Sequence, residues 1–229
     1  MQRLRPHPAL IALALLGIAA AGPAHADKRG RAYGLYAFLP ANGISPTLHC
    51  DSGWLDRAIG GTRSSYKANV NYGSTMYVQS MECESRGDGC HGHDESHLEA
   101  GWLFKGSPFE VTWSHMDAAD DDTCCRNQGD RSSRFTGLTF GGRPVTVTGR
   151  PNQVLSVTGQ ATLILNESTH EHDDDDECDD DGEHVTLHLI LKNGGEVKLG
   201  CLDLHRDDLC CRAVSVHHST WGGVKAVYR

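Results

Sequence analysis

The feature of this sequence that most limits its fold is an alternation of apolar and polar residues with a period of two. In the stretch 185–191 Val or Leu occupies every second position, and the stretches 145–148 and 197–201 repeat the pattern. Successive side chains of a β-strand point to opposite faces, so this period is typical of half-buried strands. Asn193-Gly194-Gly195 separates two of these runs and predicts a hairpin turn, because Asn and Gly tolerate positive φ.

Further runs of this kind recur along the chain at intervals of roughly 8–12 residues, divided by glycine-rich turns. The expected strands include Ala32–Leu39, Thr75–Glu82, Leu98–Phe104, Phe109–Ser114, Phe135–Phe140, Arg143–Thr148, Val154–Val157 and Leu163–Asn166. Helical patterning is confined to Asp51–Ile59, where we expect a turn or two of helix. The sequence therefore predicts an all-β fold, an antiparallel sandwich or barrel. Residues 83–97 and 117–134 are expected to form long insertions between the strands.

The first 26 residues have the layout of a secretory signal peptide. Arg3 and Arg5 precede thirteen apolar or glycine residues, Ala9–Ala21, and Ala24-His25-Ala26 matches a cleavage site for signal peptidase. Residues 27–229 are then expected to form a single exported domain. No second apolar run follows, so we expect no transmembrane anchor after signal cleavage. The predicted location is the periplasm, the cell surface or the extracellular medium.

The nine cysteines all follow the predicted cleavage site. In an exported protein they predict disulfides that staple the insertions to the sheets. No C-x-x-C spacing occurs, which excludes a thioredoxin-type motif, a zinc ribbon and c-type haem attachment. Because nine is odd, one thiol must stay reduced, bind a metal or form an intermolecular disulfide, and we assign this thiol to Cys178.

The segment Phe135–Leu204 resembles a known family. Its residues are Thr136–Gly149 with Gly137-Leu138 and Gly142-Arg143-Pro144-Val145, then Pro151-Asn152-Gln153, Asn166-Glu167 and Leu187-His188. In this order the motifs resemble the choice-of-anchor P family of bacterial exported β-rich domains, and Ala32–Leu35 is similar to the start of such domains. The resemblance implies an exported β-domain of unassigned function, with no catalytic residues to carry over. We expect the chain to depart from the family in having no C-terminal anchor, and it also carries Cys/His/Asp-rich insertions.

The most unusual local feature is the segment 170–184, which holds ten acids, three His and one Cys in fifteen residues, without Lys or Arg. Charge of one sign at this density predicts a solvated loop. Carboxylates suit Ca²⁺, whereas imidazole and thiolate suit Zn²⁺, Ni²⁺ or Cu²⁺. An EF-hand is excluded, because Glu177 and His188 would occupy loop positions one and twelve. An acidic loop that attracts cations weakly and a specific metal site both remain open. The candidate metal ligands are His170, His172, Asp174, Asp176, Cys178 and His184.

A second histidine-rich stretch is Cys90-His91-Gly92-His93 with His97. A His-x-His pair on a strand places both rings on one face, as a metal site requires. Gly87, Gly89 and Gly92 instead favour a loop with surface histidines, and the spacing implies no third ligand. Both interpretations remain open.

Composition and motifs limit the function. A formal net charge of −9 argues against nucleic-acid binding, which needs a basic face. The sequence has no G-x-S-x-G elbow, P-loop or dinucleotide-binding glycine pattern, and the acidic run from Asp117 to Asp122 is interpreted as a solvated loop. We therefore predict a non-enzymatic binding or structural protein of the cell surface or extracellular space. The alternative is a divalent-metal-binding protein that uses segment 170–184. A hydrolase whose site the spacing does not reveal is a third class.

Overall fold

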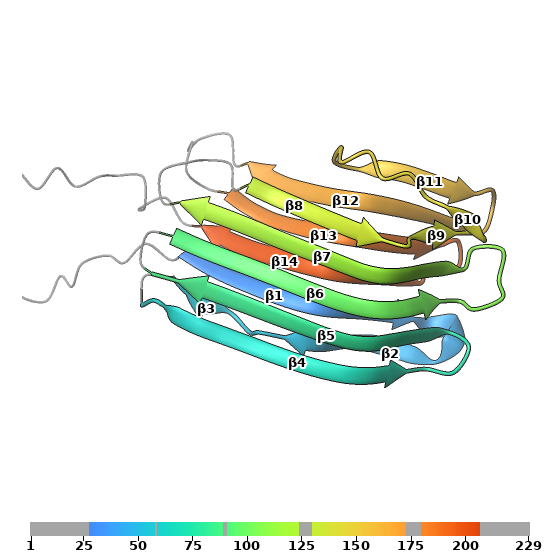
Figure 1. Ribbon diagram of the computed structural model, residues 1–229, viewed down its shortest axis with the longest axis horizontal. Helices are drawn as coiled ribbons and strands as arrows, with labels where there is room; N and C mark the ends of the chain where they lie inside the picture. Colours follow the sequence, from blue (N-terminus) through green and yellow to red (C-terminus); the bar gives the residue numbers. More distant parts are fainter. Residues whose placement is uncertain (1–27, 58, 89–90, 124–129, 173–179, 207–229) are drawn as a thin grey trace, which may run out of the picture.

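The computed structural model describes residues 28–57, 59–88, 91–123, 130–172 and 180–206. In these residues two antiparallel sheets stack face to face (Figure 1). Sheet A has the spatial order β11 (Gln153–Val157), β12 (Ala161–His172), β13 (Asp180–Leu191), β14 (Glu196–Arg206), β1 (Lys28–Leu39) and β2 (Ile44–Asp51), with β3 (Leu55–Asp56) also paired to β1. Sheet B has the order β10 (Arg143–Pro144), β9 (Thr139–Phe140), β7 (Val111–Thr123), β6 (His91–Leu103), β5 (Met76–Gly87) and β4 (Gly61–Asn71), with β8 (Asp130–Thr136) also paired to β7.

The predicted all-β antiparallel fold is confirmed, and of the two predicted architectures the sandwich is the observed one. The inward side chains of both sheets form one apolar cluster. Leu35, Leu187 and Leu199 of sheet A and Met81 and Leu98 of sheet B are almost fully buried in it. The alternation of residues 185–191 has the expected cause, because Leu187, Leu189 and Leu191 face this cluster.

The predicted insertions at 83–97 and 117–134 are wrong in the described residues, because the strands continue through them. Residues 83–87 belong to β5, 91–97 to β6, 117–123 to β7 and 130–134 to β8. Their inward side chains are small or polar rather than apolar, which hides the strand period. The fully or nearly fully buried ones include Ser85, Asp94, Ser96 and Asp120.

A buried ion pair balances the charge in this polar part of the interior. Arg57, just after β3, forms an ion pair with Asp94 of β6, and both side chains are 1% exposed. Glycines make room for the arginine, because a Cβ at Gly30 or Gly92 would overlap its guanidinium, and one at Gly87 would press tightly against the arginine. The contact joins the two sheets, since β3 belongs to sheet A and β6 to sheet B.

A second ion pair supports the neighbouring strands. Arg131 of β8 contacts Asp120 of β7 at 3.2 Å, and both side chains are largely buried. The same guanidinium donates a hydrogen bond of 3.2 Å to Ser168 of β12 in sheet A. Polar contacts therefore replace apolar packing between the sheets in the part of the sandwich around Arg57 and Arg131.

Several local predictions are corrected. The range Asp51–Ile59 contains the short strand β3 instead of a helix, and the one helical element of the described residues is a 3-10 turn, η1 (Pro40–Asn42). The run Arg143–Thr148 forms a strand only at Arg143–Pro144. β2 and β4 were not predicted. Both are edge strands, and in β4 only Val70 is buried, so no alternation marks it.

The predicted disulfide staples are not supported. Cys50, Cys83 and Cys201 are free and buried. The other six cysteines, Cys178 among them, lie outside the described residues. The predicted signal peptide, residues 1–26, also lies outside them, and no helix in the described part of the chain is long and apolar enough to cross a membrane.

The buried pair predicts a large cost for removing its acid. Asp94→Ala takes away the carboxylate that balances the charge of Arg57 in the interior, and this should lower the free energy of unfolding by about 3–5 kcal/mol. The matched control is Asp51→Ala, which removes a partly exposed aspartate 2.7 Å from Arg31 and should cost below about 1 kcal/mol. Urea denaturation measures both. Equal, small losses in the two variants would contradict the assigned role of the buried pair.

Candidate metal site on the outer face of sheet B

The outer face of sheet B carries histidines and carboxylates side by side on β6 and β7. The antiparallel register pairs His93 with Asp121, His97 with Asp117, and Glu99 with His115. Each pair therefore places an imidazole next to a carboxylate across the two strands. We call the outward-facing set the histidine–carboxylate ladder. It consists of His93, Glu95, His97 and Glu99 of β6 with His115, Asp117 and Asp121 of β7.

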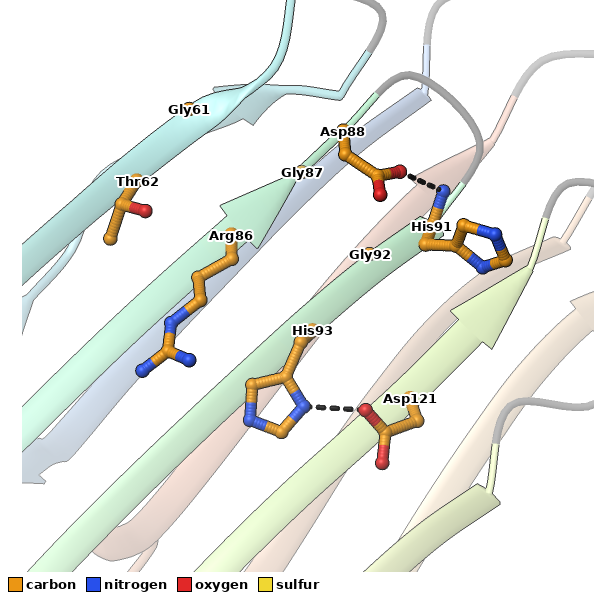
Figure 2. Close-up of a pocket in the computed structure, with 9 residues that line it drawn as sticks. All are labelled: Gly61, Thr62, Arg86, Gly87, Asp88, His91, Gly92, His93 and Asp121. Atoms are coloured by element: carbon orange, nitrogen blue, oxygen red, sulfur yellow. Dashed lines mark hydrogen bonds and ion pairs between the residues drawn. The ribbon is translucent and has the colours of Figure 1, made fainter.

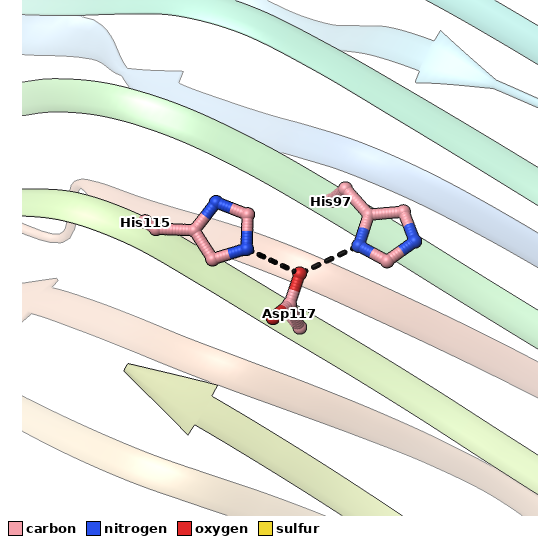
Figure 3. Close-up of side chains that lie close together, drawn as sticks. All are labelled: His97, His115 and Asp117. Carbon is pink, nitrogen blue, oxygen red and sulfur yellow. Dashed lines mark hydrogen bonds and ion pairs between the residues drawn. The ribbon is translucent and has the colours of Figure 1, made fainter. Parts of the chain in front are cut away.

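Two imidazoles of the ladder converge on one carboxylate oxygen (Figure 3). Asp117 Oδ1 lies 2.5 Å from His97 Nδ1 and 2.9 Å from His115 Nε2. One donor atom from each of the three residues lies within 4.8 Å of the other two. The side chains of His97 and His115 are 41% and 38% exposed, so the cluster is open to solvent.

The contacts continue along the ladder without a break. Glu95 Oε2 lies 3.4 Å from His97 Nε2 and 3.1 Å from His93 Nε2. At one end His93 Nδ1 is 2.6 Å from Asp121, and at the other His115 Nδ1 is 3.4 Å from Glu99. Every histidine of the ladder is thus in contact with two carboxylates.

These contacts shift the protonation equilibria of the ladder. Burial lowers the pKa of His97, but the hydrogen bond to Asp117 and the charges of Asp117 and Glu95 outweigh it, so the pKa is raised above 6.5. The pKa of His93 is raised in the same way, with Glu95 and Asp121 outweighing burial. Burial alone would raise the pKa of Glu95, but its histidine neighbours and Arg86 lower it overall. The imidazoles of His93 and His97 therefore keep a proton to higher pH than an isolated imidazole does.

The same donor set suits a divalent transition metal. Imidazole nitrogens together with a carboxylate oxygen are common zinc ligands, at roughly 2.0–2.2 Å from the ion. Tetrahedral ligands at that distance lie roughly 3.3 Å apart. The separations of 2.5 and 2.9 Å around Asp117 Oδ1 are those of hydrogen bonds, so each imidazole nitrogen must move away from this oxygen by less than about 1 Å to admit an ion.

A pocket of about 460 Å³ adjoins the ladder at the end nearest the turn between β5 and β6 (Figure 2). His93 and Asp121 belong to both the ladder and the pocket wall, and Arg86 and His91 extend the wall across β5 and β6. Thr62, Arg86, His93 and Asp121 are consecutive cross-strand neighbours in the register, which explains how four strands contribute to one pocket.

The structure places the ligands predicted in segment 170–184 as follows. His170 and His172 belong to β12 and His184 to β13, so the solvated loop is shorter than predicted. The predicted ligands Asp174, Asp176 and Cys178 lie outside the described residues, so the proposed set remains a prediction.

His184 is not in a solvated loop, which corrects that part of the prediction. It is 4% exposed, and its Nε2 forms a hydrogen bond of 2.8 Å with Ser133 Oγ of sheet B. Burial, together with the charge of Arg131, lowers its pKa to about 4. The side chain is therefore a neutral group in the polar interior.

The second histidine stretch is placed on a strand. Gly92, expected to favour a loop, is part of β6, and its inward face is occupied by Arg57. The side chains of His93 and His97 share the outer face, and Cys90 lies outside the described residues. The candidate ligands that the spacing does not supply come from β7, because His115 and Asp117 approach His97 across the sheet. The His-x-Asp spacing at 115–117 is a signal for two ligands on one strand face, but only the register connects them with His97.

No family model matches this chain, and no curated protein or solved structure shows a match to it. The resemblance to the choice-of-anchor P family stays a prediction.

The buried imidazole predicts acid sensitivity. Between pH 6.5 and about 4 the unfolded chain binds a proton at His184 that the folded protein excludes, so the free energy of unfolding falls as the pH falls. The loss across this window should be up to roughly 3 kcal/mol. His184→Gln should flatten this part of the profile, whereas the control His91→Gln, at an exposed position, should keep it. An unchanged slope in His184→Gln, followed by urea denaturation at each pH, would refute this role.

Proposed function

We propose that this protein is an exported, non-enzymatic β-sandwich that binds a divalent transition metal ion at His97, His115 and Asp117. The observation that carries the proposal is the convergence of His97 Nδ1 and His115 Nε2 on Asp117 Oδ1. The pairing of β6 with β7 holds all three residues on one face of sheet B.

The ligand types favour zinc and its neighbours over calcium. Calcium and magnesium prefer six or more oxygen ligands or several retained waters, whereas two of the three donors here are imidazole nitrogens. Glu99 lies 3.4 Å from His115 Nδ1, the ring nitrogen that the ion does not use. A carboxylate in that position fixes the tautomer so that Nε2 offers its lone pair to the metal.

The non-enzymatic and exported parts of the proposal rest on different observations. The three donors lie on the outer face of a sheet and are partly exposed, which suits binding of an ion from solution better than enclosing a substrate. Export rests on the signal-like residues 1–26. The acidic segment 170–184 would add attraction for cations near the domain.

Metal content after purification and dialysis tests the proposal. Wild-type protein loaded with Zn²⁺ should retain the ion at this site, and His115→Ala should lose it, because two donors hold zinc much less tightly than three. The control His49→Ala removes a half-buried histidine that contacts Tyr72, away from the ladder, and should retain the ion. Elemental analysis by mass spectrometry gives the stoichiometry.

A second variant separates this site from the acidic segment. The triple substitution His170→Ala, His172→Ala and Cys178→Ala should leave the ion at the ladder in place. If instead the triple variant loses all bound zinc while His115→Ala keeps it, the metal belongs to segment 170–184 and the site proposed here is wrong.

Protons should compete with the metal. A metal-bound histidine must be deprotonated. Asp117 and Glu95, which face His97, keep the pKa of its ring above 6.5. Glu82 of β5 is the cross-strand neighbour of His97. Zinc affinity should therefore rise with pH through the region just above 6.5, by about tenfold per pH unit for each proton displaced. Isothermal titration calorimetry in buffers of different ionisation enthalpy measures both affinity and proton release. A pH-independent affinity would contradict binding through His97.

A further inference from the structure

The ladder has a symmetrical order of groups that the first metal site does not explain. Read along its contacts, it runs carboxylate, histidine, carboxylate, histidine, carboxylate, histidine, carboxylate, with His97 at the centre. The order is Asp121, His93, Glu95, His97, Asp117, His115 and Glu99. On either side of His97, one carboxylate oxygen lies between two imidazoles.

The half that contains His93 repeats the chemistry of the half that contains His115. Glu95 Oε2 is contacted by His93 Nε2 at 3.1 Å and His97 Nε2 at 3.4 Å. These two oxygen–nitrogen separations are close to the roughly 3.3 Å expected between ligands of a tetrahedral zinc ion. Among the described residues the set with all donor atoms within 4.8 Å of one another is His97, His115 and Asp117, so the His93 and His97 rings must approach each other to share an ion. The other oxygen, Glu95 Oε1, lies 3.4 Å from Arg86, which leaves Oε2 directed at the histidines.

The terminal histidines are held alike. Asp121 lies 2.6 Å from His93 Nδ1, as Glu99 lies near His115 Nδ1, so each ring presents Nε2 toward the inner carboxylate. His97 differs from both, because its two ring nitrogens each face a carboxylate that is flanked by a second histidine. The pocket of about 460 Å³ borders His93 and Asp121 and gives space for water ligands of an ion bound on this side.

We infer that the ladder binds a second divalent ion between His93, Glu95 and His97, and that His97 bridges the two ions. This inference rests on the proposed function, because the first ion occupies the His97, His115 and Asp117 set. His97 binds the first ion through Nδ1 and the second through Nε2. Its ring proton leaves to solvent when the second ion binds, so the bridge is an imidazolate.

Copper(II) is a suitable probe, because an imidazolate couples the spins of two bridged ions. We would titrate the full mature chain carrying His170→Ala, His172→Ala and Cys178→Ala, which removes the acidic segment's nitrogen and sulfur ligands. Stoichiometry comes from calorimetry and spin coupling from electron paramagnetic resonance. The parent should bind two ions, and the mononuclear signal that grows during the first equivalent should decline during the second.

Two variants locate the second ion. His93→Gln and the isosteric Glu95→Gln should each bind one ion with a full, uncoupled signal, while their thermal unfolding without metal stays close to that of the parent. His97→Gln should remove the coupling entirely. If both variants bind one ion, misfolding of one variant does not explain the loss of the second ion.

Different failures have different meanings. If the parent binds one ion and His93→Gln changes nothing, the second site is refuted and the first survives. If two ions bind but their spins stay uncoupled, the bridge is refuted. If no ion binds to the ladder, the proposed function fails together with this inference.

Discussion

The structure depends on the buried ion pair between Arg57 and Asp94. A sandwich needs its inward positions filled, and at this end the inward residues of β5 and β6 are Ser85, Asp94 and Ser96 instead of large apolar groups. A buried carboxylate is tolerated only beside an opposite charge with good contacts. Arg57 supplies that charge, and the glycines around it admit its guanidinium. Because the buried charges balance there, β6 extends beyond the apolar cluster. Its outer face then carries His93, Glu95, His97 and Glu99 of the ladder.

The fold class could be predicted from the sequence because the apolar half of the sandwich obeys the period of two. The stretch 185–191 and its hairpin at Asn193–Gly195 are the clearest examples. The limits of the strands could not be predicted, because Asp94 and Asp120 have the sequence appearance of loop residues. Their burial depends on Arg57 and Arg131, which arrive from other parts of the chain. β4 illustrates a different failure, since an edge strand with one buried side chain has no apolar pattern to detect.

The sequence indicates the β6 half of the candidate site but not the β7 half. The His-x-His pair His91 and His93 shares a face if the segment is a strand, with His97 nearby in the sequence, and the glycines beside them favour a loop. What the sequence lacks is the register that sets His115 and Asp117 against His97, eighteen and twenty residues along the chain. The acidic segment 170–184 has the more extreme composition and gives the stronger sequence signal for metal binding. In the structure its last histidine, His184, is an interior group bonded to Ser133, so a high local density of metal-binding residue types does not by itself define a site.

The central claim is that a metal ion binds where His97, His115 and Asp117 converge. Anomalous diffraction at the zinc edge from a crystal of zinc-loaded protein tests it most directly. The account predicts an anomalous peak at roughly 2.0–2.2 Å from His97 Nδ1, His115 Nε2 and an oxygen of Asp117. Zinc peaks only elsewhere on the chain, or none at this face of sheet B in crystals that contain zinc, would contradict it.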